Sequence, residues 1–223
     1  MSEFSGKAFV LRVDDLTARA SESTFFADLA FLALQEVRPI IIAPNASAAR
    51  ALVRTINRSA NQAVGLNGAD AAMLPGHGEG LGKVQPGILQ TLMHGGYIPV
   101  IEPTAFGVFG DDVELVADDV AQAVAAATEA VRAIFFHALG GVNDPKTEAL
   151  IEELTAAEAL EIAAQPTIPA DLRAAIRAAA LGVRAGVGAA QIVDGRIAHA
   201  AIVEVLTARH LGTQVTGGVY TGG

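Results

Sequence analysis

Residues 192–213 read IVDGRIAHAAIVEVLTARHLGT, and this closing stretch carries several structural signals in close succession. The apolar run over 190–193 predicts a buried strand, and the Asp-Gly-Arg sequence after it predicts a turn. Apolar residues at helical spacing then predict a helix over 199–207. A glycine and a threonine lead into a last strand over 213–215. A strand, a turn, a helix and a strand within so few residues indicate an α/β fold.

The same alternation extends back through the rest of the chain. Short apolar runs, typical of buried parallel strands, alternate with segments of helical periodicity. The other predicted strands cover 9–13, 38–43, 62–66, 97–101 and 131–136. The other predicted helices cover 22–37, 45–59, 85–94, 117–130, 147–153, 155–163 and 169–182. Residues 67–83 predict a glycine-rich loop, and 103–112 predict a turn or hairpin. This order predicts a mostly parallel sheet with helices on both faces.

The composition indicates one sizeable core. The chain has 223 residues, of which 52% are AVILMFWYC and 17% are charged, and its mean hydropathy is +0.41. That length suits one large α/β domain. No apolar run approaches the roughly 18 residues of a membrane span, and the N-terminus lacks the apolar segment of a signal peptide. We therefore expect a cytoplasmic protein without a membrane partner.

The residue content excludes several classes of site. The chain has no cysteine, so disulfides, thiolate nucleophiles and cysteine-ligated metals are excluded. The histidines are scattered, and no pair has the i, i+4 spacing of a helical metal site, so no metal site is predicted. The formal net charge is −9 and no basic stripe carries aromatic residues, which argues against nucleic acid as a partner.

The order of several segments resembles the N-acetylglutamate kinases. The resembling segments are VRTINR (53–58), QAVGLNGAD (62–70), GGYIPVIEP (95–103), VADDVA (116–121), FFHALGGV (135–142) and the closing stretch quoted above. Each segment is weakly specific alone, whereas their order and spacing together make the resemblance strong. It covers about three-quarters of the chain.

The resemblance implies an amino-acid kinase fold, which is an αβα sandwich around a mostly parallel open sheet. It implies a single domain over 1–223, with a shortened N-terminal lobe over about 1–130 and a nucleotide-type C-terminal lobe over about 131–223. Family members work in arginine biosynthesis, where they transfer the γ-phosphoryl group of MgATP to the carboxylate of an acyl amino acid. The implied assembly is a homodimer, with a hetero-oligomer containing a related subunit as the alternative.

Both phosphate-facing turns depart from the family pattern. The family has a KxGG turn after the first strand, whereas this chain has RVDD over 12–15. The two aspartates put negative charge where glycines would admit a phosphate. The family's second turn is HGGG, whereas this chain has APNA over 43–46, with no glycine and with a proline that lacks an N–H donor. The family's substrate arginine and second lysine also have no counterpart, since the latter's segment reads QPTIPAD over 165–171.

The resemblance nevertheless assigns candidate site residues. Asp118 and Arg12 stand at catalytic positions, because the family uses an aspartate to orient its lysines and a lysine at the first turn. The nucleotide-binding candidates are His137 and Gly141, and the substrate-binding candidates are Asn67 and Gly68.

Structural roles compete with several of these assignments. Arg12 could form an ion pair with Asp14, Asp15 or Asp118, and Asp118 could be a favourable charge at a helix start. His137 could be a buried histidine with satisfied hydrogen bonds. Arg196 and His199 of the closing stretch are predicted to serve packing or helix capping.

Three functional hypotheses remain open from sequence alone. The first is a non-catalytic relative that binds a metabolite or pairs with another subunit, because several catalytic positions are changed together. The second is a working kinase with a rebuilt site that uses Arg12, Lys83 or Arg173 as its cation and acts on an acyl amino acid or a smaller acceptor. The third is a cation site formed by aspartates, since carboxylates suit ions such as Mg²⁺. These aspartates are Asp14, Asp15, Asp111, Asp112, Asp118 and Asp119.

Overall fold

A computed structural model describes residues 4–15, 24–59, 62–77, 80–144, 147–207 and 210–218. Within these residues, an eight-stranded sheet has the order β10-β12-β11-β9-β1-β2-β6-β3. Its strands are β1 (Ala8–Arg12), β2 (Arg38–Ile42), β3 (Ala63–Leu66), β6 (Ile98–Ile101), β9 (Arg132–Phe136), β10 (Glu153–Thr155), β11 (Ala189–Val193) and β12 (Thr213–Thr216). The predicted mostly parallel sheet is therefore confirmed.

The sheet is parallel from β11 through β3 and reverses direction at one end. β9, β1, β2 and β6 pair with their neighbours in parallel, while β12 pairs antiparallel with β11 and parallel with β10. Because parallel neighbours end at the same edge, the carboxyl ends of β1, β2 and β9 lie together. The residues that follow these three strands therefore share one edge of the sheet.

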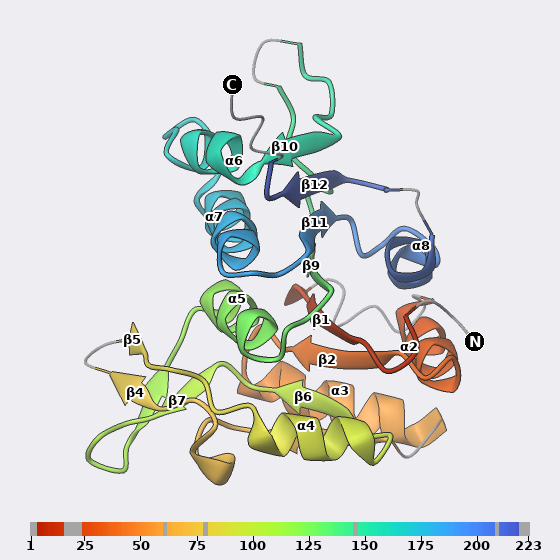
Figure 1. Ribbon diagram of the computed structural model, residues 1–223, viewed down its shortest axis with the longest axis vertical. Coiled ribbons are helices and arrows are strands. Elements are labelled where there is room, and N and C mark those ends of the chain that lie inside the picture. The colour runs from red at the N-terminus through yellow and green to blue at the C-terminus, as the bar shows by residue number, and fades with distance from the viewer. Residues whose placement is uncertain are drawn as a thin grey trace.

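Helices cover both faces of the sheet (Figure 1). One core contains side chains of α4 (Gly87–His94), α5 (Ala117–Ala127), α6 (Ala156–Ala163) and α7 (Ala170–Arg184). The other contains side chains of α2 (Phe25–Leu34), α3 (Ala46–Ser59) and α8 (Ala200–Leu206). The first two residues of the predicted helix 22–37 lie outside the described residues. No helix in the described ranges is long and apolar enough to cross a bilayer.

The central strand β1 shows why the sheet needs both layers. Phe9 and Leu11 are fully buried in the core under α2 and α3, whereas Val10 is fully buried in the core under α5. Successive side chains of a strand point to opposite faces, so a strand that is apolar at every position must be covered twice. The continuous apolar runs in the sequence thus predict the three-layer arrangement correctly.

Two small hairpins complete the described elements. β7 (Thr104–Phe106) pairs antiparallel with β8 (Asp112–Glu114), which confirms the predicted hairpin over 103–112. The predicted loop 67–83 contains a 3-10 turn, η1 (Asp70–Ala72), and a second hairpin of β4 (Gly76–His77) and β5 (Gly80–Leu81).

The predicted helix over 147–153 is wrong. The Ile151 N–H donates to Val142 O at 2.8 Å, and the Asp144 N–H donates to Ala149 O at 2.8 Å, so the chain doubles back here. Strand β10 then begins at Glu153 and pairs with β12. Pairing along this sheet edge supplies backbone hydrogen bonds that outweigh the modest helical propensity of the segment.

The Asp-Gly-Arg turn of the closing stretch has a structural role. Arg196 pairs with Asp194 at 2.7 Å and donates from Nη2 to the carbonyl oxygen of Ala138 at 2.9 Å. Asp194 has a lowered pKa, chiefly because it accepts hydrogen bonds from Arg196. His199 precedes α8 without capping it, and its Nδ1 instead lies 2.8 Å from Oδ1 of buried Asp28 on α2. Both side chains thus make polar contacts that hold the closing stretch, and His199 does not cap α8 through its side chain.

Close backbone packing explains why a glycine, Gly212, precedes the last strand. A Cβ at this position would lie 2.0 Å from Ile192 O and 2.7 Å from Gly140 O. Both neighbours are backbone atoms, which cannot move aside without shifting their strand or turn. The closing stretch therefore requires glycine here for close approach of two backbones.

We predict that Gly212→Ala lowers the free energy of unfolding by about 2–4 kcal/mol, because the added methyl group overlaps backbone atoms. Urea unfolding followed by circular dichroism measures the change. Gly87→Ala is the matched control, since a Cβ at the first residue of α4 meets nothing within 4 Å and should be neutral or slightly stabilising. Equal effects of the two substitutions would contradict this packing account.

Candidate functional site

An ion pair lies at the carboxyl edge of the sheet. Arg12 is the last residue of β1 and Asp118 lies in the first turn of α5. The Nε of Arg12 is 2.8 Å from Oδ1 of Asp118, and its Nη2 donates to Oδ2 at 3.3 Å. The side chains are only 16% and 5% exposed, respectively. The family resemblance assigned both residues to the catalytic site, and in the structure their side chains are in contact.

The environment of Asp118 is dominated by burial. Burial raises the pKa of this carboxyl above its ordinary value of 3.8, although Arg12 and His137 act in the opposite direction. The charged form is thus held in a poorly solvated position by its partner arginine. Removing either member would leave the other charge partly buried without compensation.

Beside this pair, a cleft of about 240 Å³ opens at the ends of β1, β2 and β9. Its charged lining consists of Arg12, Asp14, Asp15 and Asp171, and the lining also includes His137 and Pro44. The arginine is already paired with Asp118. Among the described lining residues, the cleft therefore presents one engaged cation and three carboxylates.

His137 is buried at the end of β9 and has contacts on both ring nitrogens. Its Nδ1 accepts from the Leu139 N–H at 3.2 Å, and its Nε2 lies 3.4 Å from Oδ2 of Asp171. An accepting Nδ1 places the proton of the neutral ring on Nε2, facing the carboxylate. His137 lines the cleft as the sequence predicts, and its polar atoms are satisfied within the protein.

The turn after β2 offers few free donors to an anion. Pro44 has no N–H, and the Ala43 N–H donates to Ile101 O at 2.9 Å. Asn45 accepts the Ala48 N–H through Oδ1 at 2.9 Å, so it caps the start of α3. Its Nδ2 lies 3.4 Å from Oδ1 of Asp15. The Ala43 and Ala48 N–H groups of this turn are therefore already hydrogen-bonded within the protein.

Gly141 lies away from the cleft lining. It is buried with a φ of +150°, and a Cβ there would lie 2.6 Å from Leu150 and 3.1 Å from Thr213. The following Val142 N–H donates to Thr213 Oγ1 at 2.8 Å. This packing accounts for the glycine, and its predicted role in nucleotide binding stays a prediction.

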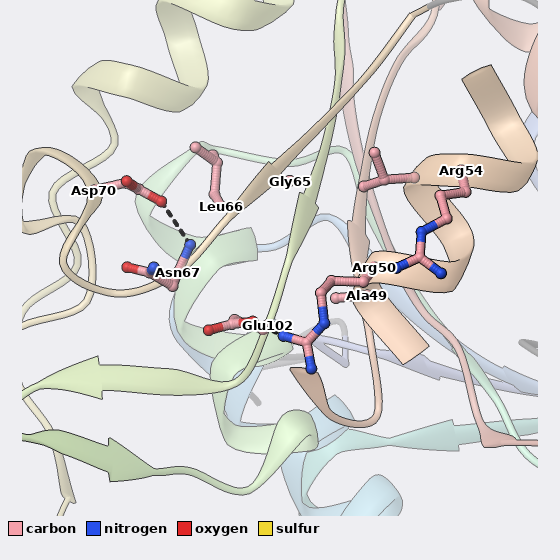
Figure 2. Close-up of a pocket in the computed structure, with 9 residues that line it drawn as sticks. Ala49, Arg50, Arg54, Gly65, Leu66, Asn67, Asp70 and Glu102 are labelled. Carbon is pink, nitrogen blue, oxygen red and sulfur yellow. Dashed lines mark hydrogen bonds and ion pairs between the residues drawn. The ribbon is translucent and has the colours of Figure 1, made fainter. Parts of the chain in front are cut away.

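The substrate-binding candidates lie elsewhere, beside a larger pocket of about 460 Å³ that we call the α3 pocket. Its polar lining comprises Arg50, Arg54, Asn67, Asp70 and Glu102. Figure 2 shows the arginines projecting from α3, with Asn67 and Asp70 on the loop that follows β3. The neighbouring Gly68 is buried, where a Cβ would lie 2.1 Å from Thr104 O. Asn67 thus lines a pocket, whereas close packing explains Gly68.

The aspartates proposed as a cation site are distributed among separate elements. Asp118 pairs with Arg12, and Asp119 pairs with Arg177 of α7 at 2.8 Å. Asp111 and Asp112 belong to the β7–β8 hairpin. Within the described parts of the chain, no three acidic or histidine side chains gather into a possible metal site. The structure gives no support to the third sequence hypothesis.

Sequence reasoning missed the contributions of Asp171, Arg50, Arg54 and Glu102. The two arginines are four residues apart on a helix, a spacing that places them on one face, so this signal was available. Tertiary packing places Asp171 in the lining of the central cleft and Glu102 in the lining of the α3 pocket. No residue spacing in the sequence indicates either position.

We predict strong energetic coupling between Arg12 and Asp118. Asp118→Ala should lower the free energy of unfolding by about 2–4 kcal/mol, because it leaves a partly buried guanidinium unpaired. The double variant Arg12→Met/Asp118→Ala should lose about 1–3 kcal/mol less than the sum of the single variants. Urea unfolding of all variants completes the double-mutant cycle. The matched cycle at Asp119 and Arg177, whose side chains are 38% and 52% exposed, should give a coupling below about 1 kcal/mol.

We also predict the sign of the pH dependence at Asp118. Its pKa is raised on folding, so the native state binds this proton more tightly than the unfolded state. The resulting stabilisation is fully present below pH 3.8 and is lost as the pH rises through the folded pKa. Relative to Asp118→Asn, the wild type should therefore gain stability as the pH falls through that range, measured by urea unfolding at each pH. A relative loss of stability would show that the Arg12 charge outweighs burial.

The sequence of this chain is similar to that of known kinases. The amino acid kinase family model matches residues 11–194. The acetylglutamate kinase of Carboxydothermus hydrogenoformans is 31% identical over 187 residues, which cover 74% of this chain and 63% of the relative. The acetylglutamate kinase of Synechococcus sp. strain RCC307 is 35% identical over 183 residues, with 74% and 60% covered. The chain thus spans less than two thirds of the length of these relatives.

Solved structures share the fold at lower sequence identity. N-acetylglutamate synthase from Neisseria gonorrhoeae, complexed with coenzyme A and N-acetyl-glutamate, has a TM-score of 0.83 at 17% identity over 97% of this chain and 61% of that one. Carbamate kinase from Giardia lamblia bound to AMP-PNP has a TM-score of 0.70 at 12% identity over 96% and 99% of the two chains. Together with the family match over most of its length, these similarities establish that the chain belongs to the amino acid kinase family and is a distant homologue of acetylglutamate kinase.

Proposed function

We propose that this chain is a non-catalytic member of its family that acts as a binding or regulatory subunit. The observation that carries the proposal is the charge of the central cleft, where three aspartates face one arginine that is already engaged by Asp118. Phosphoryl transfer depends on cations and backbone donors that neutralise the phosphates. The described lining of this cleft presents mainly negative charge instead.

Electrostatic repulsion between a carboxylate and a phosphate is large enough to weaken nucleotide binding. A carboxylate about 4 Å from a phosphate charge repels it by about 1 kcal/mol in water and by about 4 kcal/mol at a protein surface of low effective dielectric constant. Asp14, Asp15 and Asp171 all line the cleft, and solvent screening keeps the contribution of Asp171, which is 74% exposed, near the lower of these values. Turning Arg12 toward a phosphate would leave Asp118 charged and 95% buried, which adds the penalty of an unpaired charge.

The residues present therefore do not fit MgATP, which members of the family bind. The carbamate kinase that shares this fold was solved with AMP-PNP, so the fold itself is compatible with an ATP analogue. In this chain, Pro44 and the Asn45 cap restrict the backbone donors after β2, and the aspartates follow β1. The incompatibility arises from these side chains.

An active kinase with a rebuilt site is the second candidate, and one observation favours it. Arg173, in the first turn of α7, has a buried Nε without a hydrogen-bond partner among the described residues. A bound anion would supply that partner. Neither Arg173 nor Lys83 lines the central cleft, and Lys83 is exposed after β5 without a comparable buried donor, so it is the weaker candidate for the cation.

Location and assembly remain proposals. The sequence favours a cytoplasmic protein that forms a homodimer or pairs with a related subunit. β10 and β3 are the end strands of the described sheet, so each has one edge without a strand partner there. An unpaired strand edge can support association with another chain. Sedimentation velocity would measure the assembly directly.

We predict no ADP formation from MgATP with N-acetylglutamate or other acyl amino acids as acceptors. The reason is that Arg12, the cation among the described lining residues of the cleft, is already engaged by Asp118. A coupled assay of ADP release measures the activity. Acceptor-dependent ADP release that Asp118→Ala abolishes would overturn the proposal in favour of the active kinase.

We further predict that removing cleft charge improves nucleotide binding. Asp14→Asn/Asp15→Asn should raise the affinity for Mg-AMP-PNP at least about 10-fold over the wild type, since two repulsive charges are lost. Isothermal titration calorimetry provides the measurement. The control Asp111→Asn/Asp112→Asn removes the same charge from the β7–β8 hairpin and should change the affinity little. Equal gains from both variants would show that overall charge, rather than the cleft, governs binding.

A further inference from the structure

The α3 pocket has walls of opposite charge. Arg50 and Arg54 extend from α3 on one side, and Asp70 and Glu102 lie beside the ends of β3 and β6 on the other (Figure 2). From this arrangement we propose that the α3 pocket binds a small, neutral α-amino acid in its zwitterionic form. Its carboxylate would face the arginines and its ammonium group the acidic residues.

The arginines are available to a ligand. Arg50 Nη1 lies 3.9 Å from Glu102 Oε2, at the outer limit of an ion pair, and its side chain is 63% exposed. Such exposed pairs contribute little stability, so a ligand can displace them at small cost. Arg54 lies one helical turn further along and forms no ion pair with the other described residues. Two guanidinium groups on one helix face are well suited to a carboxylate.

The acidic wall is held in place by the protein. Asp70 accepts the backbone N–H of Asn67 through Oδ2 at 2.8 Å, which leaves Oδ1 for a ligand. Asn67 uses its Oδ1 to accept the Ala69 N–H at 2.8 Å, so its side-chain amide is oriented as well. Glu102 follows β6, and its side chain is 19% exposed. These positions provide acceptors for an ammonium group.

The lining also defines the charge and size of the ligand. Two arginines are balanced by two carboxylates, which favours a ligand without net charge. Ala49, Val53 and Leu66 contribute apolar surface, which favours a short aliphatic side chain. A volume of about 460 Å³ accommodates a molecule of this class.

Gly65 keeps the wall of the pocket on the β3 side open. A Cβ at this position would lie 3.3 Å from Val53 Cγ2, and a longer side chain would extend into the pocket. Gly65 lies within a strand and has no positive φ, so a β-branched residue suits its backbone. Gly65→Val therefore offers a way to fill the pocket without changing its charges.

An amino-acid site would give the proposed binding function its ligand. Only the biological role of the site rests on that proposed function, because binding itself is tested independently. The α3 pocket is lined by residues distinct from those of the central cleft. Binding at the α3 pocket and ADP formation can be measured on the same preparation. ADP formation would overturn the non-catalytic proposal alone, whereas failure of amino-acid binding would overturn this inference alone.

The test is a titration of the ¹⁵N-labelled full chain with glycine, L-alanine, L-valine and L-leucine, followed by NMR shifts of the Gly65 and Asn67 amides. We expect saturable shifts with at least one of these amino acids. Relative to the tightest binder, its N-acetyl derivative and the amine lacking its carboxylate should bind at least about 10-fold more weakly, because each lacks one charged group. No saturable shift with any of the four would overturn the inference.

Variants then locate the bound molecule. Arg54→Gln, Glu102→Gln and Gly65→Val should each raise the Kd about 10-fold or more. Arg58→Gln removes the same charge from α3 outside the pocket lining and should leave the Kd within about twofold. An unchanged Kd in Arg54→Gln and Glu102→Gln, or an equal loss in Arg58→Gln, would overturn the placement of the ligand in this pocket.

Discussion

The ion pair between Arg12 and Asp118 is the interaction on which the central cleft depends. It joins the end of the central strand β1 to the start of α5 and uses the arginine that the cleft would otherwise offer to an anion. Burial raises the pKa of Asp118, so this carboxylate needs its partner in order to stay charged. The same contact therefore joins β1 to α5 and, under the proposed function, limits what the cleft can bind.

The fold does not depend on the charged residues of the central cleft. Strands that are apolar on both faces, such as β1, require helices on each side whatever residues follow them. Close backbone contacts at Gly212 and Gly68 fix the final strand and the β7–β8 hairpin. Since none of these features involves phosphate chemistry, the charged cleft residues could change while the architecture of the amino acid kinase family was retained.

Apolar periodicity in the sequence predicted the mostly parallel sheet and the helices on both of its faces. The resemblance to N-acetylglutamate kinases assigned Arg12 and Asp118 to the site, and the structure shows which aspartate Arg12 contacts. The sequence prediction failed at 147–153, where pairing between β10 and β12 determines the backbone conformation. It also missed Asp171 and Glu102, whose positions depend on tertiary packing between elements distant in sequence. Arg50 and Arg54 could have been found from their helical spacing, although that spacing does not reveal the acidic wall opposite.

The central claim is that the charges lining the central cleft, with Arg12 engaged by Asp118, disfavour a bound triphosphate. A crystal structure determined after soaking with Mg²⁺ and an ATP analogue tests this most directly. The account predicts that the Arg12–Asp118 pair remains intact and that no triphosphate occupies the cleft beside His137 and Pro44. An ordered triphosphate there, with Arg12 turned away from Asp118 to bind it, would contradict the account.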